Sequence, residues 1–434
     1  MNLIESGPVT FGQLSFLRSI EPIPMERHAE ANQLVVLPLP ANVGATAAVD
    51  AWNQLVLRNE TLRTTYEIGS RDPVQHVHVH RAAQVSTLKL EAATFEAALE
   101  AVRPFLAEPI SIWAGSPWRA FLGAVDGVYR YLIAIVHHCA ADHTACLLLE
   151  EQFRQLLTGT ELPPPARPLD LARRQRAAQA RNLDVINYWA HAWGGMVDED
   201  RRGPDPTRRT QAAISSRSAM SAVRRIAERL NVSAASVVLA ATYLALFEVK
   251  QRSAVTLALM SSNRFDRRWE SMVSCMNQIA PLTVHRDPNM ATADFVRAVA
   301  SSSTEAYMRG SYSVDALRDH LTELGVPNPD PITFDCFFNF VGTGEAIPPD
   351  DSVLATSVEW QPAARETGPR LNIRVGTGEA LAVSVRASQD YLAPDLVGQL
   401  AVSIEAALIS LADEQLTTAK MLSFAALRDV PPRP

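Results

Sequence analysis

Length is the property that most limits how this chain can fold. Domains usually hold about 100–200 residues each, and this sequence has 434. A run of prolines interrupts the pattern at Pro163, Pro164, Pro165 and Pro168, where neither a helix nor a central strand is expected. The sequence therefore predicts an N-terminal lobe of residues 1–170 and a C-terminal lobe of residues 171–434. The proline segment is the predicted crossover between them.

Both lobes show the periodicities of mixed helices and strands, which predicts the α/β class with two-layer lobes. In the first lobe the strand patterns cover 34–39, 74–79, 118–123 and 129–136, and the helical patterns cover 46–58, 94–106 and 146–157. In the second lobe the helical patterns cover 218–230, 234–249 and 393–412, and the strand patterns cover 255–260, 279–284, 333–340, 371–375 and 381–387.

Composition and charge exclude several classes of function. The net charge is −7 and the basic residues are scattered, so no phosphate-tracking surface and no nucleic-acid partner are expected. Glu5 lies early and no basic stretch leads into an apolar run, so no secretory signal is predicted. The longest apolar run, at 237–247, is too short to span a bilayer. The cysteines lie far apart and read as reduced thiols, which predicts a cytoplasmic protein; they are Cys139, Cys146, Cys275 and Cys336.

The strongest chemical signal is the segment His-His-Cys-Ala-Ala-Asp-His at residues 137–143, which directly follows the apolar strand pattern. Adjacent residues at the end of a strand point to opposite faces, so one histidine can face a cavity while the other packs inward. A neutral imidazole suits removal of a proton from an attacking amine or alcohol. We therefore take His138 as the candidate catalytic residue, with His137 and Asp142 beside it.

These histidines have other possible interpretations. The pair could belong to the core or the surface without any chemistry. A zinc site is disfavoured because adjacent histidines diverge and no third ligand has suitable spacing. Cys139 is a weak nucleophile candidate because no positive group activates it. His76, His78 and His80 alternate along a strand pattern, and we interpret them as a solvated strand face. No metal site is predicted.

The histidine segment resembles the signature of the HHxxxDG acyltransferases, which include the condensation domains of nonribosomal peptide synthesis. Further segments resemble the other motifs of these domains, in order and along essentially the whole chain: residues 10–16, 58–66, 115–119, 262–264 and 272–282. Three departures occur. His143 replaces the motif glycine, Asn59 replaces a usual histidine, and a late motif is barely recognisable at 309–315.

The resemblance implies a stand-alone condensation domain with two chloramphenicol-acetyltransferase-like lobes in a V-shaped pseudodimer. A tunnel at their junction would hold His138, which would assist attack of an amine or hydroxyl on an acyl thioester. The acyl group would arrive on the phosphopantetheine of a peptidyl or acyl carrier protein. The chain itself would bind no cofactor and would be a monomer working in natural-product biosynthesis, such as that of antibiotics.

The same resemblance assigns structural roles to several charged residues. It implies that Asp142 forms an ion pair with Arg264, joining the histidine loop to a strand of the second half. Arg58 and Arg63 are expected to brace the first lobe, and Arg119 also falls in the supporting set.

Three residues are candidates for contact with substrate. Asn277 falls where a loop of the second lobe is expected to approach the tunnel, and Asn339 lies between two phenylalanines. A motif glycine points to a left-handed or closely packed backbone, so His143 is the sharpest departure. Its ring either narrows the tunnel beside His138 or turns outward, and the sequence leaves both open.

Two other functions remain as alternatives. One is a catalytically idle platform that recruits carrier proteins or tailoring enzymes, and the intact histidine pair speaks against it. The other is an acyl-CoA-dependent alcohol acyltransferase. The sequence lacks a segment resembling Asp-Phe-Gly-Trp-Gly, which argues against the plant branch of that class.

Overall fold

The computed structural model describes residues 2–69, 72–80, 82–179, 182–200, 208–330, 334–342, 357–361 and 369–412. The chain forms two compact units. Unit 1 consists of Met1–Asp184, Ser262–Gln278 and Ser311–Leu317. Unit 2 consists of Val185–Ser261, Ile279–Gly310 and Arg318–Pro434. The division thus differs from the one drawn at residues 170 and 171, because the first unit extends to Asp184 and includes two later segments.

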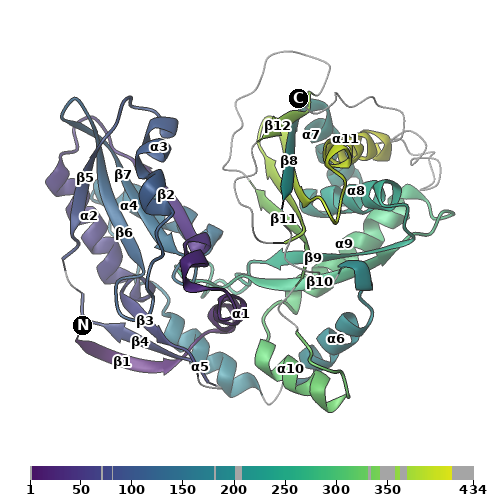
Figure 1. Cartoon of the computed structure of the whole chain (residues 1–434), viewed down its shortest axis with the longest axis horizontal. Helices are drawn as coiled ribbons and strands as arrows, with labels where there is room; N and C mark the ends of the chain where they lie inside the picture. Colours follow the sequence, from purple (N-terminus) through teal and green to yellow (C-terminus); the bar gives the residue numbers. More distant parts are fainter. Residues whose placement is uncertain are drawn as a thin grey trace. The chain divides into compact units, whose positions relative to one another are not determined.

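Unit 1 contains two sheets (Figure 1). The larger has the strand order β2 (Asn32–Pro38), β7 (Val128–His137), β6 (Trp118–Val125) and β5 (Val85–Lys89). In it, β5 and β6 are parallel and the other pairs are antiparallel. The smaller sheet is antiparallel, with the order β1 (Leu3–Pro8), β4 (Val74–His78) and β3 (Thr64–Glu67).

Strand β7 is buried on both faces, which explains its continuous apolar sequence. Leu132, Ala134 and Val136 pack on the side of α2 (Ala45–Arg58) and α4 (His143–Leu157). Ile133 and Ile135 alternate with them and pack on the side of α3 (Phe95–Leu106). The strand is therefore held rigidly from both sides up to its last residue, which positions the histidine turn that follows.

Helix α4 begins at His143 rather than at residue 146. The Asp142 carboxylate caps it, accepting a hydrogen bond from the Ala145 N–H at 2.9 Å. Apolar periodicity starts later, at Cys146, so the sequence pattern missed the first turn. A side-chain cap satisfies an N–H group that has no partner within the helix.

Two helices of unit 1 were not predicted. Helix α1 (Phe11–Ile20) begins with a capping box, in which Thr10 and Gln13 each bond the other's backbone N–H. Helix α5 (Pro168–Gln179) packs against β1. The expectation that the proline segment excludes a helix is wrong at Pro168, because the first turn of a helix does not need the missing N–H. The remaining short elements are the 3-10 helices η1 (Met25–Ala31) and η2 (Glu60–Arg63).

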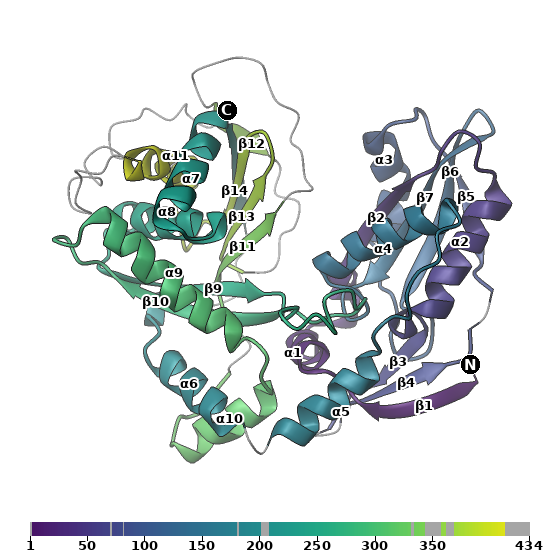
Figure 2. The same cartoon turned by 180° about the vertical axis from the view of Figure 1, so that it is seen from behind.

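Unit 2 is built on a mixed sheet (Figure 2). Its strand order is β10 (Gln278–His285), β9 (Ala254–Ser261), β11 (Cys336–Gly342), β13 (Leu371–Thr377), β14 (Leu381–Ser388), β8 (Arg209–Ser216) and β12 (Glu359–Gln361). Four helices pack together on one face: α7 (Arg217–Leu230), α8 (Ala234–Val249), α9 (Thr292–Met308) and α11 (Pro394–Leu411). The other elements are α6 (Leu183–Gly194), η3 (Asp198–Asp200) and α10 (Val314–Glu323). The first residues of α6, to Asp184, and of α10, to Leu317, are assigned to unit 1.

Helix α8 has the predicted bounds, because its start is set locally by the Ser233 side chain, which accepts from the Ser236 N–H at 3.1 Å. Helix α11 is long and apolar enough to span a membrane, as are α7 and α8 if that bent pair is counted as one span. In α11, however, 67% of the span is buried within the protein, as in the core helix of a soluble fold.

The described strands form three separate sheets, and none runs through both units. Each unit has its own helices packed on its own sheet. This confirms the predicted α/β class and its two-layer construction.

Candidate functional site

The two adjacent histidines lie in different surroundings. His137 ends β7 and is fully buried, with its N–H donating to the Pro117 carbonyl at 2.8 Å. His138 is half-buried, and its N–H donates to the Ala31 carbonyl at 2.8 Å. His137 is thus packed inward, whereas the side chain of His138 is only partly buried.

Burial determines the protonation state of His137. It lowers the pKa of the imidazole to about 3, and the nearby rings of His138 and His28 act in the same direction. The Cys139 N–H donates to Nδ1 of His137 at 3.2 Å, so the proton of the neutral ring resides on Nε2. His137 therefore stays neutral at physiological pH and serves to pack the strand end.

His138 is oriented by two side chains from elsewhere in unit 1. The Phe16 ring, on α1, stacks on its imidazole with a centroid distance of 4.5 Å and an interplanar angle of 6°. The Cys275 sulfur lies 3.6 Å from Nδ1 on the same imidazole. The stacking contact fixes the plane of the imidazole, and the sulfur contact fixes the position of its Nδ1.

The Cys275 thiol lies beside Nδ1 of His138. Burial raises its pKa well above the usual range, so the sulfur keeps its proton. Two oxygens can accept that proton, Oδ1 of Asn277 at 3.3 Å and the Gly12 carbonyl at 3.8 Å, and a thiol that donates to either one can accept an N–H from Nδ1 of His138. A ring protonated on Nδ1 has an unprotonated Nε2, the form that a general base requires.

Asp142 forms the predicted ion pair with Arg264. Oδ2 lies 2.9 Å from Nη1 and Oδ1 lies 2.9 Å from Nη2, a bidentate arrangement. The side chains are 2% and 5% exposed. Oδ2 also accepts from the N–H groups of Met276 at 2.9 Å and Asn277 at 3.1 Å. With the Ala145 cap, these bonds occupy both carboxylate oxygens, so Asp142 is a structural hub.

The segment Ser262–Gln278 belongs to unit 1 because of these contacts. Arg264 lies in this segment, after the end of β9, and not on a strand as expected. Its guanidinium also donates to the carbonyls of Met272 and Ser274, at 3.3 and 3.0 Å. A Cβ at Gly12 would lie 2.6 Å from the Met276 Cα, so only glycine permits this close approach of α1.

The other predicted supporting residues bind within unit 1. Arg58 joins α2 to α4 through Oε1 of Gln152 at 3.0 Å, and Asn59 donates to the same oxygen at 3.0 Å. Arg63 donates to the His78 carbonyl at 2.7 Å. Arg119 donates to the Pro109 carbonyl at 2.7 Å. These bonds end on backbone carbonyls and one amide, as bracing interactions do.

The predicted substrate contacts lie in three different places. His143 is half-buried at the start of α4, and its φ is not positive, so of the two expected alternatives, a left-handed or a closely packed backbone, the left-handed one does not occur. A first helical residue needs only ordinary helical angles. Asn277 belongs to unit 1, where its side chain binds Cys275. Asn339 is half-buried on β11 of unit 2. Contact of these residues with substrate stays a prediction.

Sequence reasoning singled out neither Phe16 nor Cys275 as a partner of His138. It also missed Tyr66, whose hydroxyl accepts from Nε2 of Gln13 at 3.1 Å and lies 3.5 Å from the Cys139 carbonyl. All three lie inside segments that resemble family motifs, which was the available signal. Their mutual contacts join residues far apart in sequence, so no local pattern could reveal them.

No group of three or more metal-binding side chains occurs among the described residues. His76 binds the Ser6 hydroxyl at 2.7 Å, and His78 binds the Thr65 hydroxyl at 2.7 Å. His78 is buried, so the interpretation of a solvated strand face is wrong for that residue. Cys139 is fully buried, and burial raises the pKa of its thiol, which makes it a poor nucleophile.

Comparison with known proteins gives a consistent family. A family model described as "Condensation domain" matches residues 24–359. Phosphinothricin tripeptide synthetase PhsC of Streptomyces viridochromogenes is 23% identical over 335 residues, which is 72% of this chain and 30% of that protein. The chain covers still smaller shares, 7% and 11%, of two other matching synthetases.

Solved structures show the same fold. The condensation domain from Monacolin K polyketide synthase MokA has a TM-score of 0.75 at 16% identity, covering 96% of this chain and 100% of that one. The structure titled "Molecular basis for condensation domain-mediated chain release from the enacyloxin polyketide synthase" has a TM-score of 0.75 at 17% identity, with coverages of 100% and 86%. The fold of this chain is therefore chloramphenicol-acetyltransferase-like.

Proposed function

The chain belongs to the condensation-domain family, and we propose that it is an acyltransferase that joins an acyl or aminoacyl thioester to an amine or hydroxyl acceptor. The observation that carries this proposal is the arrangement around His138. Its half-buried ring is stacked on Phe16, and its Nδ1 lies 3.6 Å from the Cys275 sulfur. We infer that the ring proton lies on Nδ1, next to this sulfur, and that Nε2 acts as the base.

In the proposed reaction the acceptor nitrogen attacks the thioester carbonyl carbon. Nε2 of His138 takes the proton of the amine as the carbon–nitrogen bond forms. The carbon–sulfur bond then breaks, and the departing thiolate receives that proton. The products are an amide and a free thiol, and no oxidant, metal or bound cofactor is needed. A hydroxyl acceptor gives an ester by the same steps.

The surroundings of His138 serve this proton transfer in separate ways. His137 stays neutral, so it adds no positive charge beside a base that must become positive. Both oxygens of the Asp142 carboxylate are occupied by the bonds to Arg264 and to the backbone, so the pair holds the turn without taking part in proton exchange. Rigid support of this kind reduces the reorganisation needed at the moment of reaction.

We further propose that the thioester is carried on the phosphopantetheine of a peptidyl or acyl carrier protein, as the family relationship implies. The acceptor would be a small molecule or a second carrier-bound group. We place the reaction in the cytoplasm and the protein in natural-product biosynthesis. The matching synthetases are proteins of which this chain covers only a part, and this relationship supports a role in such biosynthesis.

The test is turnover of a defined acyl carrier. Wild type and His138→Ala are incubated with octanoyl-loaded carrier protein and a mixture of amines and alcohols, and products are measured by mass spectrometry. We expect the variant to lose about 10²–10⁴-fold in rate, the usual contribution of a positioned base. His191→Ala, at an exposed histidine of α6, is the matched control and should keep its rate.

Two results would contradict the proposed acyl transfer by His138. Full turnover by a folded His138→Ala protein would remove His138 from the chemistry. Binding of carrier without turnover by wild type would favour the idle platform. Replacing the loaded carrier by octanoyl-CoA tests the acyl-CoA alternative, and we expect little product from it.

A further inference from the structure

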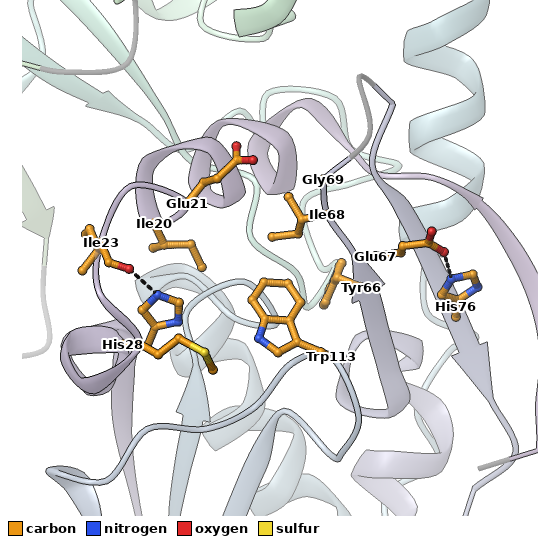
Figure 3. Close-up of a pocket in the computed structure, with 11 residues that line it drawn as sticks. Ile20, Glu21, Ile23, His28, Tyr66, Glu67, Ile68, Gly69, His76 and Trp113 are labelled. Carbon is orange, nitrogen blue, oxygen red and sulfur yellow. Dashed lines mark hydrogen bonds and ion pairs between the residues drawn. The ribbon is translucent and has the colours of Figure 1, made fainter.

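A cavity of about 600 Å³ opens in unit 1, between the end of α1, the 3-10 helix η1 and the strands β3 and β4 (Figure 3). Its walls are mainly apolar and include Ile20, Ile23, Tyr66, Ile68 and Trp113. Small-molecule sites usually have volumes of about 300–1,000 Å³ and mostly apolar walls with a few polar groups. The cavity therefore has the size and character of a ligand site.

Two segments of the cavity wall also contact the histidine turn. Phe16 stacks on His138, and Ile20 is four residues further along α1, on the same face of the helix. The segment η1 supplies His28 to the wall and ends at Ala31, whose carbonyl binds the His138 N–H. The segments that form the cavity wall thus also hold the candidate base.

The rim of the cavity is acidic. Glu21 and Glu67 line it, and no lysine or arginine is among the described lining residues. Glu21 lies 3.1 Å from Arg18, but Asp315 holds the same guanidinium at 2.9 Å. Arg18 therefore does not pair with Glu21 alone. Glu67 lies 3.3 Å from His76 and is 68% exposed. An acidic rim attracts cations and repels anions.

The wall also offers a hydrogen-bond acceptor. His28 is 9% exposed, and its Nε2 lies 2.9 Å from the Ile23 carbonyl. A carbonyl only accepts, so Nε2 carries a proton, and in the tautomer protonated at Nε2 the other ring nitrogen, Nδ1, can accept a hydrogen bond. Apolar walls, an acidic rim and an acceptor on the wall together fit a molecule with an apolar body and an N–H donor.

We propose that this cavity binds an amine with an aliphatic or aromatic body, and that such an amine is the acceptor of the reaction. The second half of this statement rests on the proposed function. The acidic rim raises the local concentration of the ammonium form, and the apolar walls hold the body. The acidic rim repels a carboxylate with the same body. An alcohol with the same body is uncharged and is not attracted to the two glutamates.

The first experiment compares probes with similar phenylalkyl bodies and head groups of different charge. Phenylbutylamine, phenylbutanol and phenylbutanoate share one body and carry positive, zero and negative charge near neutral pH. Their binding to the full chain is measured by calorimetry at low and high salt. We expect the amine to bind most tightly and the carboxylate most weakly. The advantage of the amine should shrink at high salt, because salt screens exposed charges.

The second experiment locates the binding site. Ile68→Trp fills the cavity from a half-buried position, and Val128→Trp adds the same ring at a 44% exposed position at the start of β7. We expect the first to weaken binding of the amine at least tenfold, about 1.4 kcal/mol, and the second to leave it unchanged. Glu21→Gln with Glu67→Gln, at exposed positions, should weaken the amine but not the alcohol.

The results separate this proposal from the proposed function. His138→Ala should still bind the amine, since binding does not use the base. Amine binding by a wild-type protein that shows no acyl transfer would leave the cavity as an amine site and refute the proposed reaction. Binding of the carboxylate at least as tight as that of the amine, or wild-type binding by Ile68→Trp, would overturn the cavity proposal itself.

Discussion

At the scale of single residues, two adjacent histidines differ in burial and therefore in the role that each can play. His137 faces the side of β7 that α3 covers and is fully buried, whereas His138 follows the strand end and is half-buried. Burial disfavours a charged imidazole because the interior solvates charge poorly. His137 is therefore suited to packing, and His138 keeps the access that a proton-transfer group needs.

The low pKa of His137 predicts a loss of stability in acid. Its pKa is about 3 in the folded protein and about 6.5 when unfolded. Between these values the unfolded chain binds the extra proton, so the stability is complete above pH 6.5 and falls as the pH decreases. The loss from this group is about 1.4 kcal/mol per pH unit. Urea unfolding at pH 7 and pH 5 should show a smaller loss in His137→Asn than in wild type. Equal losses in both proteins would contradict the burial argument.

Cys275 is a positioning residue, and its removal should allow the ring proton of His138 to occupy either nitrogen. Loss of one modest hydrogen bond is worth about 0.5–1.5 kcal/mol, so Cys275→Ala should lower kcat roughly two- to tenfold with little change in KM. Cys275→Ser restores an acceptor and should recover part of the rate. Nitrogen NMR of the His138 imidazole should show less protonation at Nδ1 in the alanine variant. Cys146→Ala, a second buried thiol, is the control and should leave these signals unchanged.

At the scale of elements, one ion pair decides which unit a segment joins. Asp142 caps α4 and at the same time binds Arg264, Met276 and Asn277 in the segment Ser262–Gln278. The segment follows β9 of unit 2 in sequence, but its polar groups are satisfied in unit 1. Buried polar groups require partners, so the segment is found where those partners lie.

Breaking this pair should cost far more than breaking a surface pair. Asp142→Ala or Arg264→Ala leaves a buried charge without its partner, a loss of about 3–5 kcal/mol. Both variants should melt at clearly lower temperatures, and the segment Ser262–Gln278 should become sensitive to protease. Arg154→Ala removes the exposed pair with Glu151 on α4 and serves as the control, with no change in melting temperature expected. A melting temperature of Arg264→Ala equal to that of the control would contradict the assignment.

At the scale of the whole molecule, the division into units does not follow the order of the chain. Unit 1 needs the later segments Ser262–Gln278 and Ser311–Leu317 in addition to its N-terminal part. The later segments supply Arg264 to Asp142 and Asp315 to Arg18. A fragment that ends at Asp184 lacks both partners.

This organisation predicts opposite effects of one substitution in two contexts. The fragment of residues 1–184 should melt well below unit 1 of the full chain, because its Asp142 has lost Arg264. Asp142→Asn removes the unpaired charge and should raise the melting temperature of the fragment. In the full chain the same substitution weakens the ion pair and should lower the melting temperature. Circular dichroism of the four proteins checks the prediction, and a shift of the same sign in both contexts would contradict it.

The sequence by itself determined the elements whose signals are local. The apolar run of β7, the cap and apolar sequence of α8, and the helical period of α2 depend on neighbouring residues, and their predicted bounds agree with the structure to within two residues. The motif resemblance also located His138 and paired Asp142 with Arg264, because the order of motifs is itself written in the sequence.

The tertiary structure decided everything that depends on distant partners. The stacking of Phe16, the role of Cys275 and the cavity beside α1 each join segments that are far apart in sequence. Helix α5 was not predicted because Pro168 was expected to exclude a helix. Proline is tolerated in the first turn, and the helix is packed against β1. Local patterns record backbone preference and amphipathicity, whereas burial, tautomer and unit membership follow from which distant groups satisfy one another.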